Sequence, residues 1–180
     1  MNKQNTRRAW RYVFVVAALL LAVAGFAVPE TPMIPVSGAR TRDWHPKSFW
    51  YEPWGAAGVH KGIDIFAQAG VDVLSATPGL VLYQGQLRLG GNIVAVLGPK
   101  WRIHYYAHLA DGTASLPWFV SRGERIGKVG TTGNAVGKPP HLHYSVMGIV
   151  PLPWRFSTTT QGWLRMFYVD PGALFRDAAS

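Results

Sequence analysis

The chain has 180 residues, enough for one ordinary domain and an additional segment. Hydrophobic residues make up 48% and charged residues 15%, with 20 glycines and 13 prolines, which excludes a disordered chain and disfavours a helical bundle. Eighteen lysines and arginines against nine acids give a net charge of +9. Because the chain has no cysteine, disulfides, cysteine-ligated metals and thiol nucleophiles are excluded, and a metal site must use histidine and carboxylate.

The N-terminal segment, residues 1–28, has the pattern of an export sequence. Four basic residues and no acid precede Val13, and residues 13–28 carry no charge. A basic stretch followed by an apolar run indicates a signal peptide or a single-pass membrane anchor. A helix of this length spans about 24 Å against a hydrocarbon core of about 30 Å, and Gly25–Ala27 offers small residues for cleavage, so both alternatives stay open. The positive-inside rule places the rest of the chain outside the cytoplasm, in the cell envelope or secreted.

The exported part carries 14 basic and 9 acidic residues, a net charge of +5. This charge suits an anionic envelope polymer, although ordinary solubilising charge explains it equally well. Nucleic acid is not expected as a partner, because no basic run alternates with aromatic residues.

Residues 29–57 form a segment rich in proline and aromatic residues. Its prolines exclude a long helix. The aromatic residues between Trp44 and Trp54 predict that its second half packs on the domain, either simply on the core or as the wall of a groove.

From residue 58 the pattern is typical of β-structure. Short runs rich in valine and isoleucine, separated by glycine turns, predict a mainly antiparallel β-sheet or sandwich over residues 58–172, with a tail over 173–180. The glycine-rich loop 130–140 is expected to wall a groove, and Thr160–Tyr168 to form a short helix. The expected strands are 62–66, 71–75, 79–84, 92–97, 102–109, 124–129 and 141–147.

Histidine and aspartate recur at strand spacing in two of these runs. His60 and Asp64 point to one face of a strand, and Gly62 allows the bend that would bring them to a single ion. His141 and His143 are two residues apart, so both rings share a face and can reach one centre.

A third group of polar residues lies in the run 102–109. By alternation His104, Tyr106 and His108 share a face, which alone is typical of the wet side of a half-buried strand. His104 and His45 are both expected at the surface.

Together these groups resemble the lysostaphin/LytM-like family of zinc metallopeptidases, endopeptidases that cut peptidoglycan cross-links. The resemblance covers residues 58–147, and the run 120–127 is similar to the family's V-x-x-G-x-x-I-G turn. The family pattern of H-x-x-x-D, Y-x-H-L, G-x-T-G and H-L-H occurs in that order at residues 60–64, 106–109, 130–133 and 141–143.

The resemblance implies that His60, Asp64 and His143 hold one zinc ion and leave a fourth position for water. It implies that His141 is the general base and that His108 steadies the polarised carbonyl or the tetrahedral intermediate. Zinc lowers the pKa of a bound water to about 7, and no H-E-x-x-H motif supplies a glutamate base. The implied reaction is hydrolysis of a peptide bond in bacterial peptidoglycan without an acyl-enzyme.

Two other functions remain open. A non-catalytic peptidoglycan-binding regulator of other wall hydrolases is expected to lack metal ligands, and none is missing here. A zinc peptidase acting on envelope proteins would use the same chemistry. Tyr51 and Trp54 are alternative candidates for an aromatic residue lining the site, and the insertion 151–162 for reshaping one end of the groove.

Overall fold

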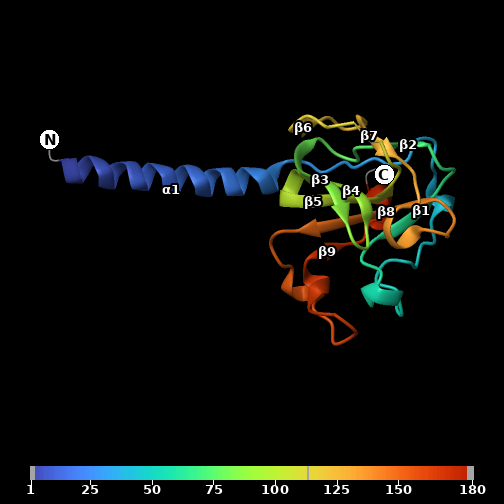
Figure 1. Cartoon of the computed structure of the whole chain (residues 1–180). Helices are drawn as coiled ribbons and strands as arrows, with labels where there is room; N and C mark the ends of the chain where they lie inside the picture. The colour runs from blue at the N-terminus through green and yellow to red at the C-terminus, as the bar shows by residue number, and fades with distance from the viewer. Residues whose placement is uncertain (1–2, 113, 178–180) are drawn as a thin grey trace.

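The computed structural model describes residues 3–112 and 114–177 (Figure 1). A long N-terminal helix, α1 (Lys3–Ala27), projects from a domain made mainly of antiparallel strands, as the sequence predicts. Residues 1–2 of the N-terminal segment and the last three residues of the predicted tail lie outside the described residues.

Helix α1 is the one described helix that is long and apolar enough to cross a membrane, over Trp10–Ala27. None of this stretch is buried inside the domain. An apolar helix with so little of its surface covered is stable in lipid or in transit through an export system, and both are compatible with the predicted anchor or signal peptide.

Nine strands form two antiparallel sheets in the part of the chain that the structure describes. The main sheet contains β1 (Ile63–Phe66), β3 (Gly79–Leu87), β4 (Gly91–Gly98), β5 (Arg102–Leu109), β6 (Phe119–Val120), β8 (His141–Gly148) and β9 (Tyr168–Val169). Its order is β1-β8-β5-β4-β3-β6, and β9 pairs with β8. The second sheet pairs β2 (Asp72–Leu74) with β7 (Arg125–Lys128).

The remaining elements are short helices in the connections. The C-terminal α-helix is α2 (Pro171–Asp177). The 3₁₀ turns are η1 (Thr41–Asp43), η2 (Gly55–Ala57), η3 (Pro99–Trp101), η4 (Gly133–Ala135), η5 (Pro153–Arg155) and η6 (Leu164–Met166).

All seven expected strands are present, with ends shifted by a few residues. Strands β6 and β9 were not expected, because two residues are too few to establish an alternating pattern. The helix expected over Thr160–Tyr168 is wrong: only Leu164–Met166 forms a 3₁₀ turn, and Tyr168 enters β9. Pairing with β8 decides the conformation there.

The core lies where the main sheet is covered by the β2–β7 pair, helix α2 and part of the segment 29–57. Tyr106 and Tyr144 are fully buried on neighbouring strands, with ring centroids 5.2 Å apart. Phe175 of α2 stacks on Tyr144, and Trp44 packs edge-on against Phe175. The second half of the segment 29–57 therefore packs on the domain as predicted.

The expected surface position of His104 is wrong, because its side chain is fully buried. Its Nδ1 lies 2.6 Å from the hydroxyl of Tyr144, and its Nε2 lies 3.6 Å from Oε1 of Glu30. Burial, and then the positive charge of Arg102, lower the pKa of His104 to about 3. His45 is exposed, as predicted.

Buried His104 should make the fold sensitive to acid. Since its pKa is 6.5 as an ordinary histidine and about 3 in the fold, the neutral ring stabilises the fold fully above about pH 6.5 and progressively less as the pH falls towards 3. We expect the free energy of unfolding of His104→Asn, which keeps a polar atom near Tyr144, to fall less steeply between about pH 6.5 and 4 than that of the parent. Denaturant titrations of the full chain in detergent measure this loss. His45→Asn is the control, and equal slopes for the parent and His104→Asn would contradict the prediction.

Candidate metal centre

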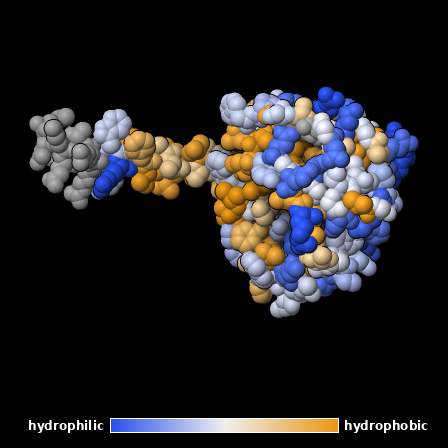
Figure 2. All heavy atoms as spheres, in the orientation of Figure 1, coloured by the Kyte–Doolittle hydropathy of each residue, from blue (hydrophilic) through white to orange (hydrophobic). Residues whose placement is uncertain are grey.

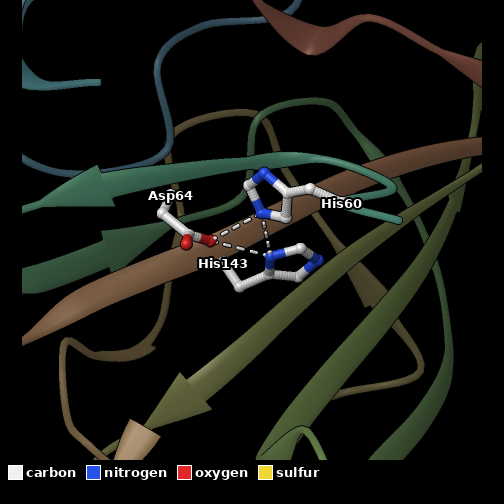
Figure 3. Close-up of side chains that lie close together, drawn as sticks. All are labelled: His60, Asp64 and His143. Atoms are coloured by element: carbon white, nitrogen blue, oxygen red, sulfur yellow. Dashed lines mark hydrogen bonds and ion pairs between the residues drawn. The ribbon is translucent and has the colours of Figure 1, made fainter. Parts of the chain in front are cut away.

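The pairing of β1 with β8 brings an aspartate and a histidine together. Asp64 lies directly opposite His143 in the antiparallel register. Directly opposite residues project to the same face of a sheet, and Nδ1 of His143 lies 2.8 Å from Oδ1 of Asp64. Figure 3 shows these two side chains and His60 pointing towards a common point.

His60 precedes β1 and turns back towards the same point. Its Nε2 lies 3.0 Å from Oδ1 of Asp64 and 3.0 Å from Nδ1 of His143. Its Nδ1–H donates to the carbonyl of Ser48 at 2.9 Å, so the neutral ring presents a lone pair at Nε2. The ring of Trp54 stacks on the face of the His60 ring, with the two ring centroids 4.0 Å apart. The ring is thus fixed in both orientation and tautomer.

Gly62 is required where the chain bends between His60 and Asp64. A Cβ atom at this position would lie 2.3 Å from the carbonyl oxygen of Tyr144 on β8. Only glycine lets β1 begin this close to β8, so the bend expected from the sequence is supported by the packing.

The three donors fit a divalent metal ion. His60, Asp64 and His143 each offer one ligand atom, and these atoms lie 2.8–3.0 Å apart. Tetrahedral ligands about 2.0–2.1 Å from an ion are separated by about 3.3 Å, close to this spacing. Two imidazole nitrogens and one carboxylate oxygen suit zinc and related ions. A cation at the centre of this triangle would be held by the negative charge of Asp64 and the ring nitrogens of the two histidines.

The electrostatics favour the ligand forms of these side chains. Burial alone would raise the pKa of Asp64, but its side-chain interactions with His143 and His60 outweigh burial and hold that pKa well below its ordinary value. Burial lowers the pKa of His143. An ionised carboxylate and a neutral imidazole are the states that metal binding needs.

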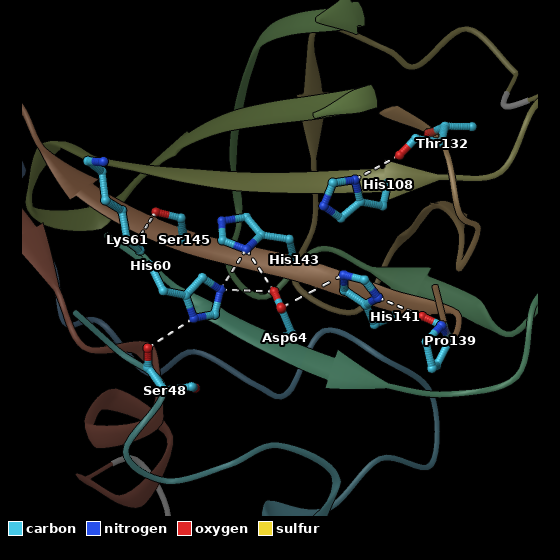
Figure 4. Close-up of polar contacts among 10 residues, drawn as sticks. All are labelled: Ser48, His60, Lys61, Asp64, His108, Thr132, Pro139, His141, His143 and Ser145. Atoms are coloured by element: carbon cyan, nitrogen blue, oxygen red, sulfur yellow. Dashed lines mark hydrogen bonds and ion pairs between the residues drawn. The ribbon is translucent and has the colours of Figure 1, made fainter. Parts of the chain in front are cut away.

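His141 lies beside this cluster, as the two-residue spacing predicts. Its Nε2 lies 3.8 Å from Oδ2 of Asp64, and its Nδ1–H donates to the carbonyl of Pro139 at 2.8 Å (Figure 4). Leu142, between His141 and His143, is fully buried in the core.

His108 reaches the same site because the alternation of β5 breaks at this residue. The register between β4 and β5 shifts opposite it, and the backbone of His108 has a φ of 63°. The expectation that His104, Tyr106 and His108 share a face is therefore wrong, since the first two enter the core. The ring of His108 lies 5.0 Å from that of His141.

The surroundings of His108 fix its protonation. Its Nδ1–H donates to the carbonyl of Thr132 at 2.9 Å. Burial, and then the charge of His143, lower the pKa of His108 to about 4. The ring is therefore neutral near pH 7, with its lone pair at Nε2.

All five predicted site residues line one pocket of about 690 Å³. The loop 130–140 contributes Asn134, Lys138 and Pro139 to its wall, as expected. No residue of the insertion 151–162, which the structure describes in full, is among the lining residues. The lining also includes large aliphatic and aromatic side chains: Trp54, Phe66, Leu87, Leu89, Ile103, Tyr105, Met147 and Tyr168.

Two aromatic residues complete the site. Of the two candidates from the segment 29–57, Trp54 lines the pocket, whereas Tyr51 packs edge-on against Trp54 and is 53% exposed. Tyr105 was not expected; it lies edge-on to His143, with ring centroids 6.3 Å apart. Burial, and then the neighbouring Tyr168, raise the pKa of Tyr105 to about 12. The pairing of Tyr105 with Ser145 on β8 places it on the site face, a relation visible only once β5 and β8 are paired.

A β-sheet groove that holds a cluster of two histidines and a carboxylate suits a metal-dependent hydrolase. The model of peptidase family M23 matches residues 58–150, more than half of the chain, and the chain belongs to that family.

Several known proteins are similar to the chain. It is 35% identical over 113 residues to the L-Ala--D-Glu endopeptidase of Bacillus subtilis (strain 168), covering 58% of this chain and 35% of that protein. It is 33% identical over 88 residues to the peptidoglycan DD-endopeptidase ShyA of Vibrio cholerae, covering 49% and 20%. The chain therefore spans about a third or less of the length of these relatives. The catalytic domain of the antimicrobial peptidase lysostaphin from Staphylococcus simulans has the same fold, with a TM-score of 0.59 at 24% identity over 76% of this chain and 95% of that one.

Asp64 should decide whether a metal ion binds. We expect Asp64→Asn to weaken zinc binding by more than about 100-fold, because it removes the one anionic ligand of the His60, Asp64 and His143 cluster. Elemental analysis after dialysis against buffered zinc measures the metal content. Asp72→Asn, which changes an aspartate on β2 whose side chain is 45% exposed, is the matched control. Retention of stoichiometric zinc by Asp64→Asn would contradict the assignment.

Proposed function

We propose that the protein is a zinc-dependent endopeptidase that hydrolyses peptide cross-links of bacterial peptidoglycan on the extracytoplasmic side of the membrane. The observation that carries this proposal is the convergence of three metal-ligand side chains and two further histidines in one pocket. Membership of peptidase family M23 supports peptide-bond hydrolysis, and the names of the Bacillus and Vibrio relatives support a wall substrate.

His60, Asp64 and His143 are the residues proposed to hold the ion. Zinc with three protein ligands supplies a Lewis acid and lowers the pKa of water to about 7. Ser48 and Trp54 hold the first ligand in place, one by accepting its Nδ1–H and the other by stacking on its ring. Such supporting contacts raise ligand basicity and reduce the freedom of the ring.

His141 is the proposed general base. The carbonyl of Pro139 accepts its Nδ1–H, so the neutral ring directs the lone pair of Nε2 towards Asp64. From this position His141 can accept a proton from the attacking water and return it to the leaving amine. Asp64 is the one carboxylate among the described residues lining the pocket, and it is assigned to the ion.

His108 is the proposed second catalytic histidine. Because Thr132 accepts its Nδ1–H, its Nε2 accepts a hydrogen bond when the ring is neutral and donates one only after taking up a proton. To steady the carbonyl oxygen, His108 would have to donate from Nε2, which requires either uptake of a second proton or a shift of the single ring proton from Nδ1 to Nε2. Tyr105 keeps its phenolic proton at all ordinary pH values and is a further donor lining the pocket.

Two lysines that line the pocket favour an anionic substrate. Lys61 and Lys138 line the pocket beside its apolar walls. The carboxylates of cross-linking peptides would lie against these cations, in keeping with the net charge of +5 on the exported part.

His141 should be needed for turnover but not for metal binding. We expect His141→Ala to lower kcat by about 10²–10⁴-fold, the usual contribution of a general base, while zinc content stays at one per chain. Turnover of purified cross-linked muropeptides measures kcat, and elemental analysis measures zinc. His45→Ala, which changes an exposed histidine, is the control. A loss of zinc equal to the loss of turnover would contradict this division of roles.

Mass spectrometry of fragments released from purified sacculi tests the reaction itself. The zinc-loaded full chain should release muropeptides with a newly cleaved peptide bond, and a chelator should stop the release until zinc is restored. Binding to sacculi without release would replace the proposal with a regulatory role. Cleavage of envelope proteins alone would replace it with proteolysis.

A further inference from the structure

Helix α1 contacts the domain within its apolar stretch. The indole Nε1–H of Trp101 donates to the carbonyl of Ala22 at 2.7 Å. The same indole lies against Gly25, where a Cβ atom would be 2.2 Å from the ring. Ala22 and Gly25 both belong to Trp10–Ala27, the stretch able to cross a membrane. The η3 turn of the domain therefore lies at the level of the helix's last turns.

The connection between α1 and the domain is short and fixed. Glu30, three residues after the helix, has a side chain only 1% exposed and forms an ion pair with Arg102, the first residue of β5. Oε1 of Glu30 also lies 3.6 Å from Nε2 of His104. A connection held by a buried ion pair leaves the domain little freedom to swing on the helix.

These contacts lie at one end of the main sheet. The η3 turn joins the end of β4 to the start of β5, and Arg102 pairs with Gly148 at the end of β8. Strand β6 pairs with the first residues of β3 at the same end. Figure 1 shows α1 running away from this end of the domain. A bilayer crossed by α1 would thus face this end of the sheet.

Large apolar side chains are exposed around this end, with exposed fractions of 42–77%. We call them the apolar rim: Trp118, Phe119, Ile149, Val150, Trp154 and Phe156. The backbone links the rim to the helix contact, because the N–H of Ile149 donates to the carbonyl of Trp101. Figure 2 shows hydrophobic surface on the side of the domain that faces α1. Such a patch marks an interaction surface, and tryptophan is enriched at membrane–water interfaces.

We propose that α1 stays attached as an anchor and that the η3 turn and the apolar rim rest in the headgroup region of the membrane that it crosses. The bilayer is the partner of this surface because the helix that would cross it contacts the domain next to the apolar rim. Ala22, which touches Trp101, lies five residues, or about 7.5 Å, inside the end of that helix. Lys100 is exposed in the η3 turn and can reach lipid phosphates.

This docking would hold the metal centre at a fixed distance from the membrane. Strand β8 runs from the site to the membrane end of the sheet, and the five residue steps from His143 to Gly148 span about 17 Å. The active site would thus work at a set distance from the membrane surface. This inference concerns membrane contact and does not depend on the proposed reaction.

Spin labels can test the docking, because the natural chain has no cysteine. The full chain is reconstituted into phosphatidylglycerol-containing bilayers with one label at Val150→Cys or, as a matched control, at Val136→Cys. Val136 is a 73% exposed valine within the loop 130–140, directly after η4, and lies away from the membrane end. We expect the label at 150 to be at least about threefold less accessible to a water-soluble nickel complex, and more accessible to oxygen, than the label at 136.

A second variant separates docking from local burial. Trp101→Ala removes the hydrogen bond to Ala22 and should raise the nickel accessibility of the label at 150, whereas Trp163→Ala, an exposed tryptophan, should not. A label at Phe156→Cys serves as an independent reporter of the rim. Equal nickel accessibility at 150, 156 and 136 would overturn the proposal. So would recovery of the mature protein from cells as a soluble chain that lacks α1. Neither outcome would affect the proposed function, which is tested by muropeptide release.

Discussion

The register between β1 and β8 is the constraint on which the site depends. It pairs Asp64 with His143, and a slip of one residue would turn one of them into the core. Two features hold the register. The buried Ile63 and Ile65 match the buried residues on the core face of β8, and Gly62 allows the close approach of the two backbones. The metal-ligand geometry is thus a consequence of how apolar residues pack on the other face of the same strands.

The sequence predicts much of this site because strand alternation is a local property. The spacing of His141 and His143, and the glycine between His60 and Asp64, are sufficient to place these side chains on one side. The side taken by His108 was not predictable, because a register shift and a left-handed backbone conformation override alternation there.

Other features depended on contacts between distant segments. His104 is polar by type, yet its hydrogen-bond partner Tyr144 comes from another strand, so sequence alone could not indicate its burial. Tyr105 joins the pocket only through the pairing of β5 with β8, and the choice of Trp54 over Tyr51 depends on a ring stacking against His60. The short strands β6 and β9 take their conformation from the strands they pair with.

The stacked indole and the Ser48 carbonyl that orient His60 both come from the segment 29–57, ahead of the residues 58–150 that match the family model. The minimal working unit is therefore larger than the region of family similarity. A protein trimmed to residues 58–150 would keep all three metal-ligand side chains while losing the supports that set the rotation and tautomer of the first. It would also lose Phe175, which stacks on the tyrosine next to His143. Boundaries drawn from similarity would accordingly give a loosened centre.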